Sequence, residues 1–135
     1  MELIDEESIK PFISLLDAYD RCFSMRSIDD FRSLHVTDKG VVFFDNHANC
    51  DSNSYAEHER KVANFFKSGE IGSIIRENIR VFMAGEMACI TAILRYSSTP
   101  RPGVRTTYVL ERENGSWKIR HMHHSFDPNE INNDA

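Results

Sequence analysis

The feature of this sequence that most constrains its fold is a series of four strand-length segments that follow one another in its second half. They run over about Ile74–Met83, Met87–Tyr96, Val104–Arg112 and Trp117–Phe126. Turn-forming residues separate them: Gly85, the Pro100–Gly103 loop and the Asn114-Gly115 pair. Because consecutive strands joined by short turns pair with each other, the second half of the chain predicts an antiparallel meander.

The first half of the chain predicts three helices and one strand. Apolar residues at steps of three and four indicate an amphipathic helix over Ser8–Met25, and Ser27 can cap a short second helix. The segment Gly40–Phe44, with the sequence GVVFF, is typical of a buried strand. Ser54 and Glu57 form a capping box at the start of a third helix. The order of elements is therefore α-α-β-α-β-β-β-β, which is an α+β fold.

Length and charge restrict the class of protein further. A chain of 135 residues fits a single domain over 1–135, with 6–127 as the ordered core and 128–135 as a tail. The net charge of −5 argues against nucleic-acid binding, which needs a basic surface. The amino terminus is acidic and no run of about 18 apolar residues occurs, so we expect no membrane partner and a cytoplasmic location.

The alternation of the last strand predicts which side chains face the helices. One face carries Trp117, Ile119, His121, His123 and Ser125. Since this face begins apolar, we expect it to lie under the helices and its polar end to line a pocket. We expect the opposite face to form a homodimer through its apolar side chains, which are Met122, Phe126, Tyr108 and Leu110.

The carboxy-terminal half also resembles a known family. The segments that carry the resemblance are GEMACITAILRY (85–96) and RTTYVLERENGSWKIRHMHHS (105–125). They are similar to the nuclear transport factor 2-like superfamily, and within it to the SnoaL-like branch. Its members include ketosteroid isomerases, SnoaL-like polyketide cyclases and the association domain of calcium/calmodulin-dependent protein kinase II. The resemblance implies a curved antiparallel sheet wrapped by helices into a cone with one open end, usually assembled as a dimer or a larger ring.

The resemblance suggests three catalytic candidates. In ketosteroid isomerases a carboxylate after the first strand takes a proton from carbon, while a tyrosine and a protonated aspartic acid hold the enolate oxygen. Asp45 matches the position of the base, Tyr19 lies close to that of the tyrosine, and Val109 stands at the place of the aspartic acid. We expect His121 to replace that missing donor. Asp45 is equally consistent with a turn, and Tyr19 with a core aromatic residue.

Further residues are expected to contact a ligand. His121 and His123 can present two imidazoles to one ligand, or can tie the sheet to the first helix. Such a pair is not a complete metal site, so we predict no metal and no cofactor. The arginine-lined cavity of kinase association domains implies a similar role for Arg95 and Arg105. The ligand-binding candidates are therefore His123, Arg95, Arg105, Ser125 and Trp117.

Two functions remain open at this stage. In the first, the protein binds a small, largely apolar molecule with a carboxylate or carbonyl group. As an enzyme it would abstract a proton next to a carbonyl, with Asp45 as the base and Tyr19 and His121 as donors to the enolate oxygen. In the second, it is a non-catalytic association or ligand-sensing module that oligomerises through its sheet. A cavity of about 300–1,000 Å³ favours the first function, and a cone filled by its own side chains favours the second.

Overall fold

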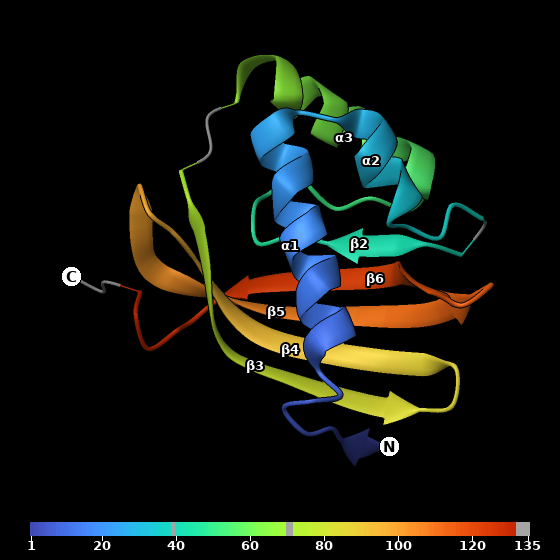
Figure 1. Ribbon diagram of the computed structural model, residues 1–135. Coiled ribbons are helices and arrows are strands. Elements are labelled where there is room, and N and C mark those ends of the chain that lie inside the picture. Colours follow the sequence, from blue (N-terminus) through green and yellow to red (C-terminus); the bar gives the residue numbers. More distant parts are fainter. Residues whose placement is uncertain (39, 70–71, 132–135) are drawn as a thin grey trace.

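The structure is a computed structural model, which describes residues 1–38, 40–69 and 72–131 (Figure 1). Within these residues the helices are α1 (Lys10–Met25), α2 (Ile28–Ser33) and α3 (Tyr55–Ser68). The strands are β1 (Glu2–Leu3), β2 (Val42–Phe44), β3 (Ile74–Ala84), β4 (Met87–Tyr96), β5 (Thr99–Glu113) and β6 (Ser116–Phe126). The predicted α+β class and order of elements are confirmed, and β1 is an additional short strand. None of the described helices has the length and apolar character to cross a membrane.

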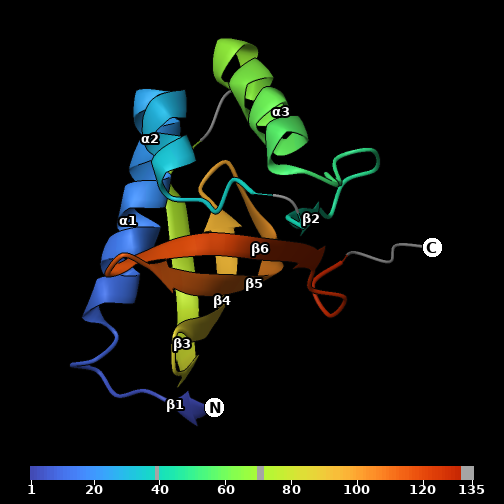
Figure 2. The same cartoon turned by 90° about the vertical axis from the view of Figure 1, so that its right-hand side faces the viewer.

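The strands form one six-stranded sheet in the order β1-β3-β4-β5-β6-β2. Figure 2 shows α1 lying along one face of this curved sheet, with α3 standing above β2. The pairs from β3 to β6 are antiparallel as predicted, whereas β2 pairs in parallel with β6. Asn114 and Gly115 join β5 to β6 with φ angles of 50° and 80°. A tight hairpin turn of this kind needs positive φ at both positions, which explains why Asn-Gly occurs there.

The predicted helix starts are confirmed by their hydrogen bonds. Ser27 Oγ accepts from the backbone N–H of Asp30 at 3.2 Å, and Ser54 Oγ accepts from that of Glu57 at 3.1 Å. Each bond satisfies a backbone donor that the first turn of a helix leaves free. The second cap fixes where α3 begins, and therefore which of its side chains reach the sheet.

A bulge in β6 changes which side chains face the helices. The pairing register between β5 and β6 shifts by one residue, which leaves Arg120 as the extra residue. Because side chains alternate with a period of two, one extra residue reverses the alternation beyond it. Ile119 before the bulge and Met122 after it are both buried in the core. The predicted inward face is thus wrong beyond Ile119, since the residues on the outer face are His121, His123 and Ser125.

The same bulge overturns the predicted dimer face. The four apolar residues expected on the outside lie on the helix side of the sheet: Met122, Phe126, Tyr108 and Leu110. Tyr108 and Leu110 are fully buried in the core. The outer face of β5 carries Arg105, Thr107 and Val109 instead.

Candidate functional site

A cavity of about 680 Å³ lies between the helices and the inner face of the sheet. Its aromatic lining comes from Tyr19, Phe23, Phe43, Phe44, Phe65, Tyr96 and Phe126. Its other polar and charged residues include Asp45, His58, Lys61 and His124. A mostly apolar cavity of this size with a few polar groups is typical of a small-molecule site. Among the residues that the structure describes, no group of three or more His, Cys, Asp or Glu side chains forms a metal site.

Asp45 lies directly after β2, at the start of the loop that leads to α3, and it also lines the cavity. Its Oδ1 accepts the backbone N–H of Asn46 at 2.6 Å, and its own N–H donates to Asp51 Oδ1 at 2.8 Å. The side chain is exposed to solvent and also lines the cavity. The loop and the pocket, which the sequence presents as alternatives, are therefore compatible.

Two tyrosines bring hydroxyl groups to the cavity. Tyr19 of α1 is 6% exposed, and its O–H donates to Met122 Sδ, a weak acceptor, at 3.8 Å. Burial raises the pKa of Tyr19 well above its ordinary value. Burial also raises the pKa of Tyr96 to about 12. Both hydroxyls are therefore protonated at neutral pH and able to donate to a ligand oxygen.

His124 of β6 lines the cavity in the place where His121 was expected. Its Nε2 atom is shielded from solvent and has no hydrogen-bond partner among the residues that the structure describes. Burial lowers the pKa of His124 to about 4, against the opposing charge of the nearby Asp45 carboxylate. The ring is thus neutral at pH 7, with one donor and one acceptor nitrogen. Strict alternation cannot find this residue, because the bulge at Arg120 is invisible in the apolar pattern.

His58 is another histidine of the cavity lining, and it is absent from the ligand-binding candidates of the sequence. It projects from α3, and its ring stacks on Phe43 with centroids 4.0 Å apart and planes at 17°. Its Nε2 is also shielded and without a partner. Burial lowers the pKa of His58 to about 3. The cavity is therefore bordered by two neutral histidines.

Four of the predicted site residues on β5 and β6 lie on the outer side of the sheet, namely Arg105, His121, His123 and Ser125. His121 Nδ1 contacts the backbone oxygen of Val42 at 2.6 Å, which ties β6 to β2. Arg105 Nε donates to Ser125 Oγ at 3.2 Å. None of these four side chains belongs to the cavity lining, and His123 is exposed beside Phe44.

Arg95 and Trp117 also lie away from the cavity. Arg95 donates to both carboxylate oxygens of Glu130, at 2.8 and 2.9 Å, and to Glu77 at 3.1 Å. The carboxylates that pair with Arg95 therefore belong to the protein itself. Glu130 lies in the predicted tail, of which 132–135 fall outside the described residues. Trp117 packs on Phe12, with ring centroids 5.1 Å apart.

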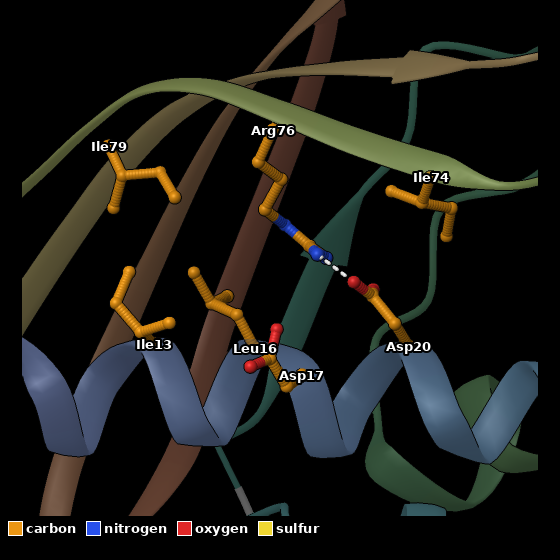
Figure 3. A pocket seen from close by; sticks show the side chains of 7 residues that line it. All are labelled: Ile13, Leu16, Asp17, Asp20, Ile74, Arg76 and Ile79. Carbon is orange, nitrogen blue, oxygen red and sulfur yellow. Dashed lines mark hydrogen bonds and ion pairs between the residues drawn. The ribbon is translucent and has the colours of Figure 1, made fainter.

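A second, smaller cavity of about 170 Å³ lies between α1 and β3 (Figure 3). Arg76 of β3 reaches across it to form an ion pair with Asp20 of α1. The Arg76 side chain is 5% exposed and also donates to Tyr108 Oη at 3.3 Å. The isoleucine and leucine side chains around this pair are Ile13, Leu16, Ile74 and Ile79. This cavity is therefore small, and its buried guanidinium is ion-paired with the half-buried Asp20 carboxylate inside the protein.

The family model of the SnoaL-like domain matches residues 13–128. The chain belongs to the SnoaL-like family. The matched range contains both cavities and every helix and strand of the domain except β1 and the first turn of α1. No curated protein sequence matches the chain.

Solved structures share the fold of this SnoaL-like domain. A protein assigned as a dehydratase of the NTF2-like family from Streptomyces avermitilis is 18% identical, with a TM-score of 0.75 over 90% of this chain and 97% of that one. A protein assigned as a calcium/calmodulin-dependent protein kinase type II association domain from Thiobacillus denitrificans is 20% identical, with a TM-score of 0.72 over 84% and 92%. A protein assigned as a ketosteroid isomerase from Shewanella frigidimarina is 17% identical, with a TM-score of 0.67 over 83% and 92%. These likenesses establish the NTF2-like fold.

Proposed function

We propose that the protein binds a small, mostly apolar molecule in the 680 Å³ cavity and moves a proton on it, as isomerases and dehydratases do. The observation that carries this proposal is the meeting of Asp45, Tyr19 and His124 on the wall of one ligand-sized cavity. An exposed carboxylate suits a proton acceptor, while a neutral imidazole and a protonated phenol suit hydrogen-bond donors. The similarity to proteins assigned as a dehydratase and an isomerase supports the same class of reaction.

The proposed reaction begins with proton removal next to a carbonyl. The Asp45 carboxylate takes the proton, and the electron pair of the broken C–H bond moves onto the carbonyl oxygen to form an enolate. Hydrogen bonds from Tyr19 and His124 stabilise the negative oxygen, which is the largest contribution in many reactions of this kind. In a β,γ-unsaturated ketone Asp45 then returns the proton to the γ-carbon of the dienolate, which completes an isomerisation. In a β-hydroxy ketone the enolate expels the β-hydroxyl as hydroxide, which takes up the proton from Asp45 and leaves as water, and this completes a dehydration.

Deuterium exchange of 2-tetralone, a small apolar ketone, tests this proposal. In D2O the wild-type protein is expected to exchange the α-protons faster than buffer, as followed by proton NMR. Asp45→Asn removes the base and is expected to lower the exchange rate by about 100-fold or more. Asp17→Asn, on the exposed side of α1, is the matched control and is expected to keep the rate. Full exchange by Asp45→Asn, or binding of 2-tetralone without exchange above buffer, contradicts the catalytic proposal.

Association through the outer face of the sheet is the second candidate function. Phe44 is 44% exposed there and contacts the rings of His121 and His123, at 5.5 and 5.4 Å between centroids. We propose that this face pairs two copies of the chain, because an exposed aromatic ring on a sheet is a common interface anchor. Phe44→Glu is then expected to convert a dimer to a monomer in sedimentation velocity, whereas Met25→Glu at the exposed end of α1 is not. A monomeric wild-type protein contradicts this candidate.

The cytoplasmic location stays a prediction.

A further inference from the structure

Phe65 of α3 lies at the entrance of the large cavity. It belongs to the cavity lining and is also 37% exposed, which places it where the cavity meets solvent. Tyr19 and Phe43 of the same lining are 6% and 3% exposed, so they lie deeper. The ring of Phe65 meets that of Phe23 of α1, with centroids 6.2 Å apart and planes at 61°. An edge-to-face aromatic pair from two helices therefore borders the entrance.

Gly69, directly after α3, leaves room for the Phe65 ring. Its φ and ψ of −74° and 149° are allowed for any residue, so the backbone conformation does not require glycine there. A Cβ atom at this position would lie within 2.6 Å of three carbon atoms of the Phe65 ring. Carbon atoms in ordinary contact are about 3.5–4.0 Å apart. The position therefore requires glycine because the ring of Phe65 occupies the space of a side chain.

Arg26, the C-cap residue of α1, holds the backbone around Gly69. Its guanidinium donates hydrogen bonds to the backbone oxygens of Phe66 and Gly69. The bond to Phe66 satisfies a carbonyl group that the last turn of α3 leaves free, and the cation lies at the negative end of the helix dipole. A side chain at position 69 is therefore expected to displace the ring of Phe65 while the backbone stays in place.

We propose that Phe65 is a specificity-determining residue of the large cavity, and that Gly69 is the residue that positions its ring. Aromatic rings attract one another edge to face, beyond the effect of the area that they bury. A saturated ring of the same outline lacks this attraction. The entrance therefore favours a ketone that carries an aromatic ring over its saturated counterpart. The inference rests on the proposed function, because it requires that the cavity bind a small ketone, but it requires no transfer of a proton.

Proton NMR tests the packing of Phe65 on Gly69 in the protein without a ligand. The ring current of Phe65 is expected to shift the signals of the Gly69 α-protons, and Phe65→Leu is expected to remove this shift. Phe82→Leu is the matched control, because Phe82 shares the outer face of the sheet with Val109 and is not part of the cavity lining. Unshifted Gly69 α-protons in the wild-type protein would overturn the positioning role of Gly69.

A pair of ketones tests the selection by the cavity. 2-Tetralone contains a benzene ring, and 2-decalone is the same bicyclic ketone with that ring saturated. The saturated ketone is the more apolar of the two, so a wall without aromatic selection would bind it at least as tightly. The wild-type protein is expected to bind 2-tetralone about 3- to 10-fold more tightly in calorimetric titrations, the effect of one aromatic pair.

Two variants trace this preference to the entrance. Phe65→Leu keeps an apolar side chain, and Gly69→Ala leaves all the cavity-lining residues unchanged. Each is expected to remove most of the preference for 2-tetralone. In the Phe65→Leu background, Gly69→Ala is expected to have no further effect, because it acts through the ring. Phe82→Leu is expected to keep the full preference.

The possible outcomes separate this inference from the proposed function. If both ketones bind without a preference, or if Phe65→Leu keeps the preference, the role of Phe65 is overturned while the binding cavity stands. If Gly69→Ala keeps a preference that Phe65→Leu removes, the positioning role of Gly69 is overturned. If neither ketone binds, the proposed function and the selection fail together. The expected preference without deuterium exchange of 2-tetralone would support the selection and contradict only the proton transfer.

Discussion

The two cavities of this molecule differ in the charge of the polar groups that line them. In the small cavity Arg76, 5% exposed, is ion-paired with Asp20, although Arg76 Nε and Asp20 Oδ1 make no hydrogen bond within the described residues. In the large cavity His58 and His124 are neutral, and each has a shielded nitrogen without a hydrogen-bond partner in the described part of the chain. The ion pair holds α1 on the sheet, whereas the neutral rings of the large cavity have no counterion to hold. The comparison therefore distinguishes a site that contains its own counterion from a neutral site.

Mild acid is expected to lower the stability of the folded protein by protonating its buried histidines, and this is the largest effect that we predict. Burial holds the pKa values of His35, His58 and His124 at about 4, 3 and 4, below the ordinary 6.5. The unfolded chain takes up these protons first, so stability is complete above pH 6.5 and falls as the pH drops toward 4. Between pH 7 and 5 we expect a loss of about 2 kcal/mol for each histidine.

Urea unfolding across this pH range measures the effect. His123→Gln, which removes an exposed histidine, is the control and should leave the pH profile unchanged. A free energy of unfolding that stays constant from pH 7 to 5 would show that the buried histidines are not neutral in the folded protein.

Removal of one charge tests the small cavity. Asp20→Ala leaves the Arg76 guanidinium buried without its counterion, which is expected to cost about 3 kcal/mol of the free energy of unfolding. The control is Asp17→Ala on the same cavity, whose exposed carboxylate should matter by less than about 0.5 kcal/mol. Equal midpoints for the two variants in urea would show that the ion pair does not hold α1 to the sheet.

Glu130 offers a test beside the large cavity, because its ion pair with Arg95 holds the segment that contains Pro102 of the cavity lining. Its carboxylate accepts from Arg95 and from the backbone N–H of Gly103 at 2.7 Å, next to Pro102 of the cavity lining. Glu130→Ala is expected to lower the free energy of unfolding and to weaken binding of 2-tetralone, because Arg95 and the backbone N–H of Gly103 lose their acceptor. Glu113→Ala, an exposed glutamate near the β5–β6 turn, is the control for thermal unfolding and calorimetry. Unchanged binding in Glu130→Ala would separate this ion pair from the ligand site.

His124→Phe is expected to have the smallest effect on stability, within about 1 kcal/mol at pH 7.5 and in the stabilising direction. The substitution removes an unsatisfied buried nitrogen and keeps a ring of similar shape, so little is lost without a ligand. Equilibrium unfolding in urea measures this. A loss above about 2 kcal/mol would show that His124 has a structural partner, as Arg76 does, and would remove the contrast between the two cavities.

Much of the fold follows from the sequence because its signals are local. Helix caps at Ser27 and Ser54 and the Asn114-Gly115 turn depend on residues within a few positions of each other. The parallel pairing of β2 with β6 depends on distant contacts, and no local pattern reports it.

The site is less predictable than the fold for a specific physical reason. Asp45 and Tyr19 do reach the cavity, since one follows a strand directly and the other lies on the regular face of a helix. Strict alternation predicts His121 on the cavity side of β6. The bulge at Arg120 turns His121 to the outer face and brings His124 to the cavity. The carboxylate that binds Arg95 comes from Glu130, which is 35 residues away and carries no motif.

The bulge at Arg120 also bears on how such proteins diverge. The segment His-Met-His-His-Ser-Phe (121–126) places two different sets of side chains on the two faces of β6. The register of the strand decides which set faces the cavity. With the bulge the cavity obtains Met122, His124 and Phe126; without it, the same stretch would offer His121, His123 and Ser125. A one-residue insertion or deletion in β6 can therefore change the cavity lining from a more apolar to a more polar set of side chains, while the residues of the segment itself stay the same. Relatives with nearly the same strand can therefore differ sharply in what they accept.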